Sequence, residues 1–162
     1  MDYPSTVAAL VSLNGGRMVG KTRLQKTVYL LKECGIDLGF DFDYHHYGPY
    51  SEELSIASSD AVALGILNLE WHNAYGNEYA VFSVAGAGPA SVNGLGAEAA
   101  AMLKILGQYD ATVLELAATA DFLEKNGYAD NAWEETERRK ASKVTPTRVK
   151  NSKKLLEELR SL

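Results

Sequence analysis

The residues with the clearest chemical pattern lie near the N-terminus, where Gly15 to Thr22 reads GGRMVGKT. This segment satisfies the P-loop pattern GxxxxGK(S/T), in which backbone N–H groups and the lysine hold nucleotide phosphates and the hydroxyl binds Mg²⁺. A P-loop follows a buried parallel strand and works with an Asp at the end of another strand. The sequence contains no run of four aliphatic residues that ends in Asp. We therefore interpret the match as a glycine-rich loop before a helix, keep nucleotide binding as an alternative, and expect no cofactor.

Three other reactive residue types have simpler interpretations. His45 and His46 are adjacent, and neither they nor His72 form an HxxxH, CxxC or HExxH spacing, so no metal site is predicted. Ser51 has no base placed by spacing, so a helix cap is favoured over a nucleophile. Cys34, the single cysteine, lies beside leucines and is interpreted as a small buried apolar residue. These patterns predict a protein that is not an enzyme.

The stretch 20–54 contains the most structured local pattern. Leu24, Val28 and Leu31 recur on one helical face of a predicted helix from Lys21 to Glu33, and Gly35 ends it. A glycine, a φ-locked proline and a capping serine follow in the turn 47–51, so the backbone must turn sharply there and open another helix.

The remaining patterns predict a mainly α (α+β) fold. A helix is favoured from Pro4 to the residues before Asn14, although alternating Val7 to Leu13 also allows a strand. Residues 36–47 suit an extended connector or a short edge strand. A third helix is expected from Ser51, and Gly65 ends it. Strands around 67–71 and 80–84 form a hairpin with a turn at Gly76-Asn77. The order of three helices and a hairpin is that of a winged helix.

The second half is predicted to be helical. Residues 85–96 form a Gly, Ala and Ser-rich linker, and Asp110 and Thr145 are predicted N-caps of later helices. We therefore expect a winged-helix-like domain over 1–88 and a C-terminal helical extension over 89–162 packed on it, with one compact domain as the alternative. The exposed edge of the hairpin permits a homodimer without requiring one.

Charge is distributed unevenly along the chain. Residues 1–35 carry five Lys/Arg and two Asp/Glu, residues 36–130 carry two and fourteen, and residues 131–162 carry nine and five. DNA binding through the basic flanks is therefore an alternative function, and its candidate contacts are Arg17, Lys21, Arg138, Arg139, Lys140 and Lys143. The third helix, which normally reads bases, instead carries Glu52, Glu53 and Asp60, which disfavours simple DNA recognition.

The composition is that of an ordinary soluble globular protein, with 46% apolar and 23% charged residues. The N-terminal apolar run is acidic at its start and too short to span a bilayer, so we expect a cytoplasmic protein with no membrane association. The single cysteine excludes an internal disulfide.

Several adjacent motifs carry a resemblance to a known family. GKTRLQKTVYLLKECG, then YHHYGPYSEEL and LGIL, stand in the order found in the bacterial YwgA-like family, and the chain resembles that family over about residues 15–85. More distantly, the KxxYLL helix followed by YGP is similar to SocA or Panacea-type antitoxin domains, whose members act by binding a partner protein. The resemblance implies a winged-helix-like fold and a partner-binding role.

We therefore expect a non-enzymatic, winged-helix-like protein-interaction or regulatory module, antitoxin-like in character. Rigid tyrosines give preorganised contact area and nearby Arg and Lys complement an acidic protein partner. The predicted surface comprises Arg23, Lys26, Tyr29, Tyr47, Pro49 and Tyr50. In the other interpretation, Tyr29 and Tyr50 only lock two helices together.

The nucleotide alternative has a direct test. If Gly15 to Thr22 holds phosphates, ATP or GTP with Mg²⁺ should raise the melting temperature, because a ligand that binds only the folded state stabilises it. Thermal unfolding with and without nucleotide measures this, and an unchanged melting temperature discards the alternative.

Overall fold

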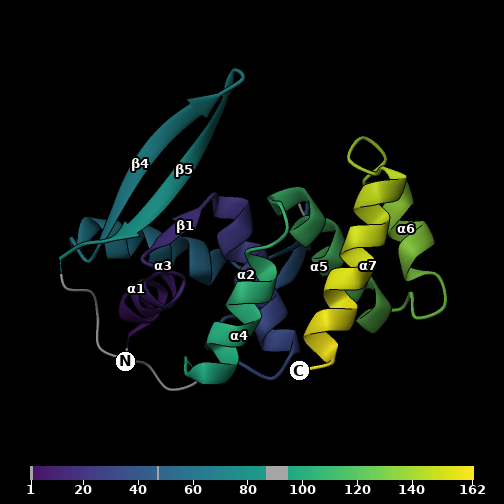
Figure 1. Cartoon of the computed structure of the whole chain (residues 1–162), viewed down its shortest axis with the longest axis horizontal. Helices are drawn as coiled ribbons and strands as arrows, with labels where there is room; N and C mark the ends of the chain where they lie inside the picture. Colours follow the sequence, from purple (N-terminus) through teal and green to yellow (C-terminus); the bar gives the residue numbers. More distant parts are fainter. Residues whose placement is uncertain (1, 47, 87–94) are drawn as a thin grey trace.

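The computed structural model describes residues 2–46, 48–86 and 95–162 and has a mixed α/β architecture with small antiparallel sheets (Figure 1). Within these residues the elements run in the order α1 (Tyr3–Leu13), β1 (Arg17–Val19), α2 (Lys21–Glu33), β2 (Asp43–His45), β3 (Gly48–Tyr50), α3 (Glu52–Ala63), β4 (Leu67–Ala74), β5 (Asn77–Val84), α4 (Ala97–Leu106), α5 (Ala111–Lys125), α6 (Ala132–Arg139) and α7 (Pro146–Arg160).

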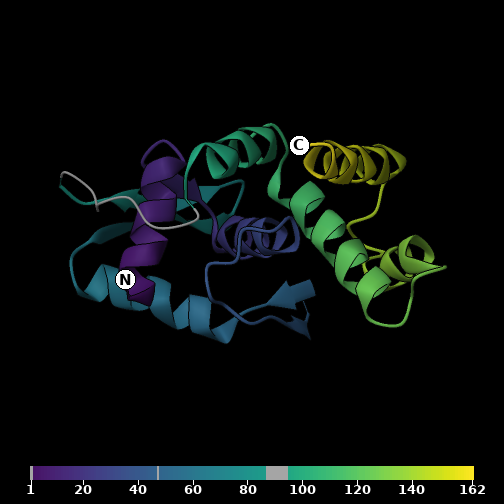
Figure 2. The same cartoon turned by 90° about the horizontal axis from the view of Figure 1, so that it is seen from below.

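Helix α2 lies at the centre of the molecule. Every residue from Leu24 to Leu31 is buried, which is more than one amphipathic face would cover. Figure 2 shows α2 between the α1 and α3 pair on one side and α5 on the other. Because α2 is enclosed in this way, its polar side chains must find partners inside the protein.

The sheet β1-β5-β4 is antiparallel throughout, with Met18 opposite Phe82 and Leu69 opposite Phe82 on the other side. Strand β1 lies inside the GGRMVGKT segment and was not predicted, because three residues are too few to give a periodic signal. All strand pairs among the described residues are antiparallel. The Gly15 to Thr22 loop therefore does not follow a parallel strand in this part of the chain.

The hairpin β4–β5 is present as predicted, but its turn is one residue earlier. Ala74 pairs with Asn77, so the turn consists of Tyr75 and Gly76, with φ values of 53° and 80°. Two-residue hairpin turns with positive φ at both positions match the right-handed twist of the strands. The predicted Gly76-Asn77 turn is wrong because Asn77 is the first residue of β5.

The helix caps match their sequence signals. Ser51, Asp110 and Thr145 each accept a hydrogen bond from the backbone N–H three residues later, at the starts of α3, α5 and α7. The segment 3–13 is helical, which decides between the two interpretations of its pattern. The turn 47–51 differs from expectation, because Gly48–Tyr50 pairs with Asp43–His45 as a two-stranded ribbon.

One hydrophobic cluster joins the two halves of the chain. It contains Leu24 and Leu54 from the first half together with Leu103, Leu114 and Leu155 from the second. The C-terminal helices thus complete the core around α2. The mixed class agrees with the sequence analysis, whereas the winged-helix comparison stays a prediction.

A close approach at Gly48 gives a stability prediction. A Cβ at this glycine, whose φ is +88°, would lie 2.4 Å from Oγ1 of Thr119. We expect Gly48→Ala to lower the free energy of unfolding by about 3 kcal/mol, from left-handed strain and overpacking together. Gly15→Ala, at a φ of +78° with no atom within 4 Å of the added Cβ, should cost only about 1 kcal/mol.

Denaturant unfolding measures both values, and the double variant isolates the clash. Gly48→Ala should lose more free energy of unfolding than Gly15→Ala, and the excess should come from the clash. Adding Thr119→Ala to Gly48→Ala should restore this excess, because the hydroxyl oxygen that meets the new methyl group is removed. Equal losses at Gly48 and Gly15, or no recovery in the double variant, would contradict the close approach.

Candidate interaction site

The backbone at the start of α3 is held by a buried glutamine. The side-chain amide of Gln25 donates to the Ser51 carbonyl oxygen at 2.9 Å, and its oxygen accepts from the Ser51 N–H at 2.8 Å. Both residues are buried, and Ser51 is the N-cap of α3. The glutamine thus satisfies both backbone groups of one residue and fixes α3 to α2.

A buried lysine holds the preceding residue. Nζ of Lys26 donates to the Pro49 carbonyl oxygen at 2.6 Å, and the side chain is 1% exposed. Burial lowers the pKa of Lys26 to about 8, although the carboxylate of Glu115 acts in the opposite direction. The amine therefore replaces the backbone donor that the Pro49 carbonyl would find in a regular sheet.

A third anchor reaches the ribbon from the C-terminal half of the chain. Nζ of Lys140, just after α6, donates to the His46 carbonyl oxygen at 2.6 Å. The same amine lies 3.3 Å from the buried carboxylate of Glu115, which also accepts from Lys143 at 2.8 Å. Burial lowers the pKa of Lys140. The ribbon β2–β3 is consequently fixed from α2 and from the α5–α6 region at once.

The side chains of the ribbon are divided between a packed side, with Tyr44 and Pro49, and a more open side, with His45 and Tyr50. The rings of His45 and Tyr50 are in contact with centroids 4.9 Å apart and an angle of 31° between their planes, and His45 and His46 are exposed. Tyr44 packs on Phe122 and under the guanidinium of Arg139. We call His45, His46 and Tyr50 the ribbon surface.

A pocket of about 190 Å³ borders Tyr50, and hydroxyl groups of Ser55 and Ser58 and the amine-bearing Lys21 lie among its lining residues. The ribbon surface therefore combines a half-buried aromatic ring with the depression that this ring lines.

Acidic residues surround this surface. Asp41, Asp43, Glu52 and Glu53 are exposed, and the Asp41 N–H donates to Oε1 of Glu53 at 3.2 Å. No Lys or Arg occurs in the sequence from residue 36 to residue 103. Carboxylates therefore predominate among the exposed charges at the ribbon, with Lys21 in the lining of the pocket. The amine of Lys32 lies 3.6 Å from Asp41, and the amines of Lys26 and Lys140 bind the ribbon's carbonyl oxygens from inside.

The structure places several predicted surface residues inside the protein. Lys26 and Tyr29 are 1% and 2% exposed, and Pro49 is buried. Arg23 donates to the carbonyl oxygens of Leu106 and Tyr109, where it caps the C-terminal end of α4. Of the six predicted residues, Tyr50 contributes to the surface, and Tyr47 lies outside the described residues.

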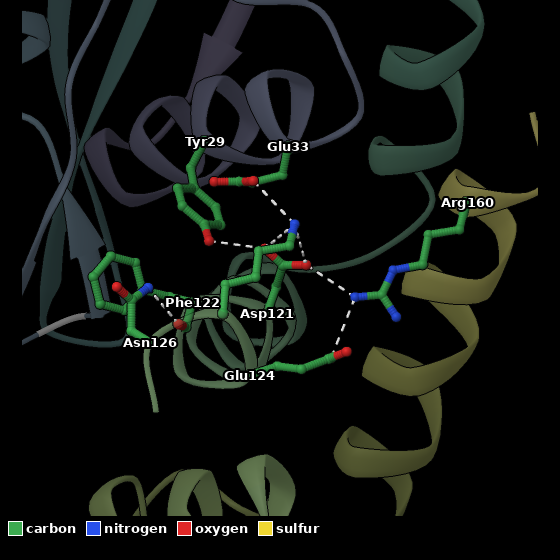
Figure 3. Close-up of polar contacts among 8 residues, drawn as sticks. Tyr29, Glu33, Asp121, Phe122, Glu124, Asn126 and Arg160 are labelled. Atoms are coloured by element: carbon green, nitrogen blue, oxygen red, sulfur yellow. Dashed lines mark hydrogen bonds and ion pairs between the residues drawn. The ribbon is translucent and has the colours of Figure 1, made fainter. Parts of the chain in front are cut away.

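Tyr29 belongs to a buried polar cluster that joins three helices (Figure 3). Its hydroxyl donates to Asp121 at 2.8 Å, and that carboxylate also accepts from Lys125 at 3.2 Å and Arg160 at 2.9 Å. Burial and the neighbouring Asp121 raise the pKa of the Tyr29 hydroxyl. Because Glu33 pairs with Lys125 at 2.9 Å, helices α2, α5 and α7 are linked through one network.

The predicted nucleic-acid contacts fall into two groups. Arg17 and Lys21 are exposed, and Nζ of Lys21 lies 5.0 Å from the centroid of the Trp71 ring. The C-terminal candidates are paired with carboxylates: Arg138 and Arg139 with Glu135, and Lys140 and Lys143 with Glu115. Much of the C-terminal positive charge is therefore compensated within the protein.

Sequence reasoning missed Gln25, Glu115, Asp121 and the role of Lys140. A signal for two of them exists, since Glu115 and Asp121 lie among apolar residues of α5, such as Leu114 and Ala120. A carboxylate on the buried face of a helix indicates a buried partner. Gln25 gives no such signal, because its position fits an ordinary helix.

Ser51 has a structural role in the described residues. The hydroxyl of Ser51 accepts from the Leu54 N–H at 3.2 Å, as a helix cap does. Within the described part of the chain, no three His, Cys, Asp or Glu side chains gather in a way that could hold a metal ion. None of the helices described is long and apolar enough to cross a bilayer.

Comparisons with known proteins give two partial similarities. The chain is 36% identical over 55 residues to the uncharacterized protein YwgA of Bacillus subtilis, a match that covers 34% of this chain and 33% of YwgA. It is 42% identical over 53 residues to a DNA ADP-ribosyl glycohydrolase of Thermus aquaticus, covering 30% of this chain and 15% of that enzyme. The chain thus matches a third or less of the length of these relatives.

These similarities support a YwgA-like relationship over about a third of the chain. No family model matches the chain, and no solved structure does.

The pKa of Lys26 predicts how stability depends on pH. Below pH 8 the lysine is protonated in both the folded and the unfolded chain, whereas between pH 8 and 10.5 only the unfolded chain holds the proton. Because the unfolded chain binds more protons in this range, the free energy of unfolding rises with pH. Relative to Lys26→Met, the free energy of unfolding of the wild type should increase by up to about 3 kcal/mol across this window.

Denaturant unfolding at a series of pH values measures this difference. Lys104→Met is the matched control, because Lys104 is exposed and its removal should leave the pH dependence unchanged. A difference at Lys26 that is flat or falls as the pH rises would show that the amine is not buried as described.

Proposed function

We propose that the chain is a non-enzymatic, winged-helix-like module that binds a protein partner through the ribbon surface and the adjacent start of α3. The observation that carries the proposal is the way the ribbon is fixed: interior side chains hold its backbone at His46, Pro49 and Ser51. The imidazole groups of His45 and His46 are exposed, and the half-buried ring of Tyr50 lies beside His45. A rigid surface of this kind loses little conformational entropy when a partner binds.

The charge around the ribbon supports a basic partner surface. The sequence alone suggested an acidic partner, because Arg23 and Lys26 were expected to be exposed. With those two cations inside, the exposed charges next to Tyr50 are mainly carboxylates, including Asp43 and Glu52, and Lys21 is the exposed cation that lines the same pocket. Complementary charge at the rim of an interface speeds association and selects the partner, so we propose a partner rich in Arg or Lys.

The proposed role is regulatory, antitoxin-like in character, and cytoplasmic. The resemblance to SocA or Panacea-type antitoxin domains supports it, since those domains act by binding a partner protein. The similarity to the Thermus aquaticus glycohydrolase involves 15% of that enzyme, so its activity is not transferred to this chain. DNA binding through the basic flanks stays an alternative.

Partner capture tests the proposal. The immobilised wild-type chain should retain a protein from a lysate of its native cells, and Tyr50→Ala should lose most of it, because truncating a central aromatic residue removes a large share of binding energy. The melting temperature of Tyr50→Ala should fall by less than about 4 °C. Mass spectrometry of the eluate and thermal unfolding give the two readouts.

Tyr75→Asn is the matched control, since it removes a fully exposed tyrosine at the hairpin tip and suits the positive φ there. It should capture the partner as the wild type does. Capture should also weaken as salt is added, because exposed charges are screened. Equal retention by Tyr50→Ala, or retention that does not respond to salt, would refute the ribbon surface as the contact.

A further inference from the structure

Strand β4 presents an open edge that the ribbon surface does not use. In the part of the chain that the structure describes, β4 pairs only with β5, so one edge of Leu67–Ala74 is unpaired along its length. The hairpin projects from the helical body, which leaves this edge accessible (Figure 1). Unpaired strand edges readily accept another strand.

Apart from the exposed carboxylate of Glu70, β4 lacks the usual protections of an edge strand. The strand contains no Lys, Arg or Pro, and its pairing with β5 runs without a bulge from Leu67 to Ala74. Its central Trp71 has 57% of its surface exposed. Edge strands that are long, regular and apolar at the centre are sites of strand addition.

We infer that this edge pairs with the same edge of a second copy of the chain, antiparallel and with Trp71 on the two-fold axis. In this register Trp71 lies opposite Trp71 of the other copy, which gives an aromatic cross-strand pair. On the opposite face of the strand, Glu70 lies across from His72 of the second copy. By symmetry, His72 lies across from Glu70 of the second copy.

Charge selects this register among its neighbours. Shifting the axis to Glu70 places two carboxylates opposite each other, which is destabilising. Shifting it to His72 removes both the tryptophan pair and the pairing of carboxylate with imidazole. Glu70 and His72 already contact each other within one chain, 3.2 Å apart, so both side chains lie on one face and are compatible with such a pairing.

A disulfide trap tests the register. In a Cys34→Ser background, Trp71→Cys should form a disulfide-linked dimer under mild oxidation, because Cα atoms of directly opposed residues are about 5 Å apart and disulfides span about 4.4 to 6.8 Å. Asn73→Cys is the matched control. Its two copies would lie about 14 Å apart and should stay unlinked. Non-reducing electrophoresis measures the linked fraction.

Sedimentation velocity tests association without new cysteines. The wild type should show a monomer–dimer equilibrium that shifts with concentration, His72→Glu should weaken it about threefold or more, and Glu70→His with His72→Glu should restore it, because the pairing is exchanged but kept. A wild type that stays monomeric at every concentration, equal linking of the Trp71→Cys and Asn73→Cys variants, or a dimer that His72→Glu leaves unchanged would overturn the inference.

Discussion

The structure depends on the enclosure of the central part of helix α2, in which every residue from Leu24 to Leu31 is buried. A helix buried on all sides cannot leave polar side chains unpaired, because an unsatisfied buried donor or charge costs several kcal/mol in apolar surroundings, on the order of 2 to 7. Gln25, Lys26 and Tyr29 therefore each bind a specific group on another element. These three contacts determine where the ribbon, the start of α3 and helix α5 lie relative to α2.

This constraint also explains why the ribbon suits binding. Its carbonyl oxygens point inward to lysines, and Gly48 lies against Thr119 with no room for a side chain. The backbone is thus fixed from inside, while His45 and Tyr50 remain outside. The residues that hold the ribbon in place are therefore different from the residues exposed on its surface. The buried lysines hold the backbone, whereas the exposed charges near the surface are mainly carboxylates.

The elements with local signals were predictable. Proline and capping residues placed the starts of α3, α5 and α7, and the alternation around Leu69 and Phe82 predicted the hairpin. Strand β1 was not predictable, because three residues form a strand only when β5 supplies the partner. For the candidate site, sequence motifs found the turn and Tyr50, whereas the anchors Glu115 and Lys140 come from distant positions in the chain.

The sequence by itself determined the order of the helices and the hairpin, the apolar face of α2 and the acidic character of the middle segment, since these depend on spacing and residue type. Only the tertiary structure decided which charges face water. Lys26 and Lys140 look like surface residues in any local window, and they become interior because α5 and α6 pack over the ribbon and bring Glu115 to them. Burial is a property of the whole packing arrangement, and no local pattern encodes it.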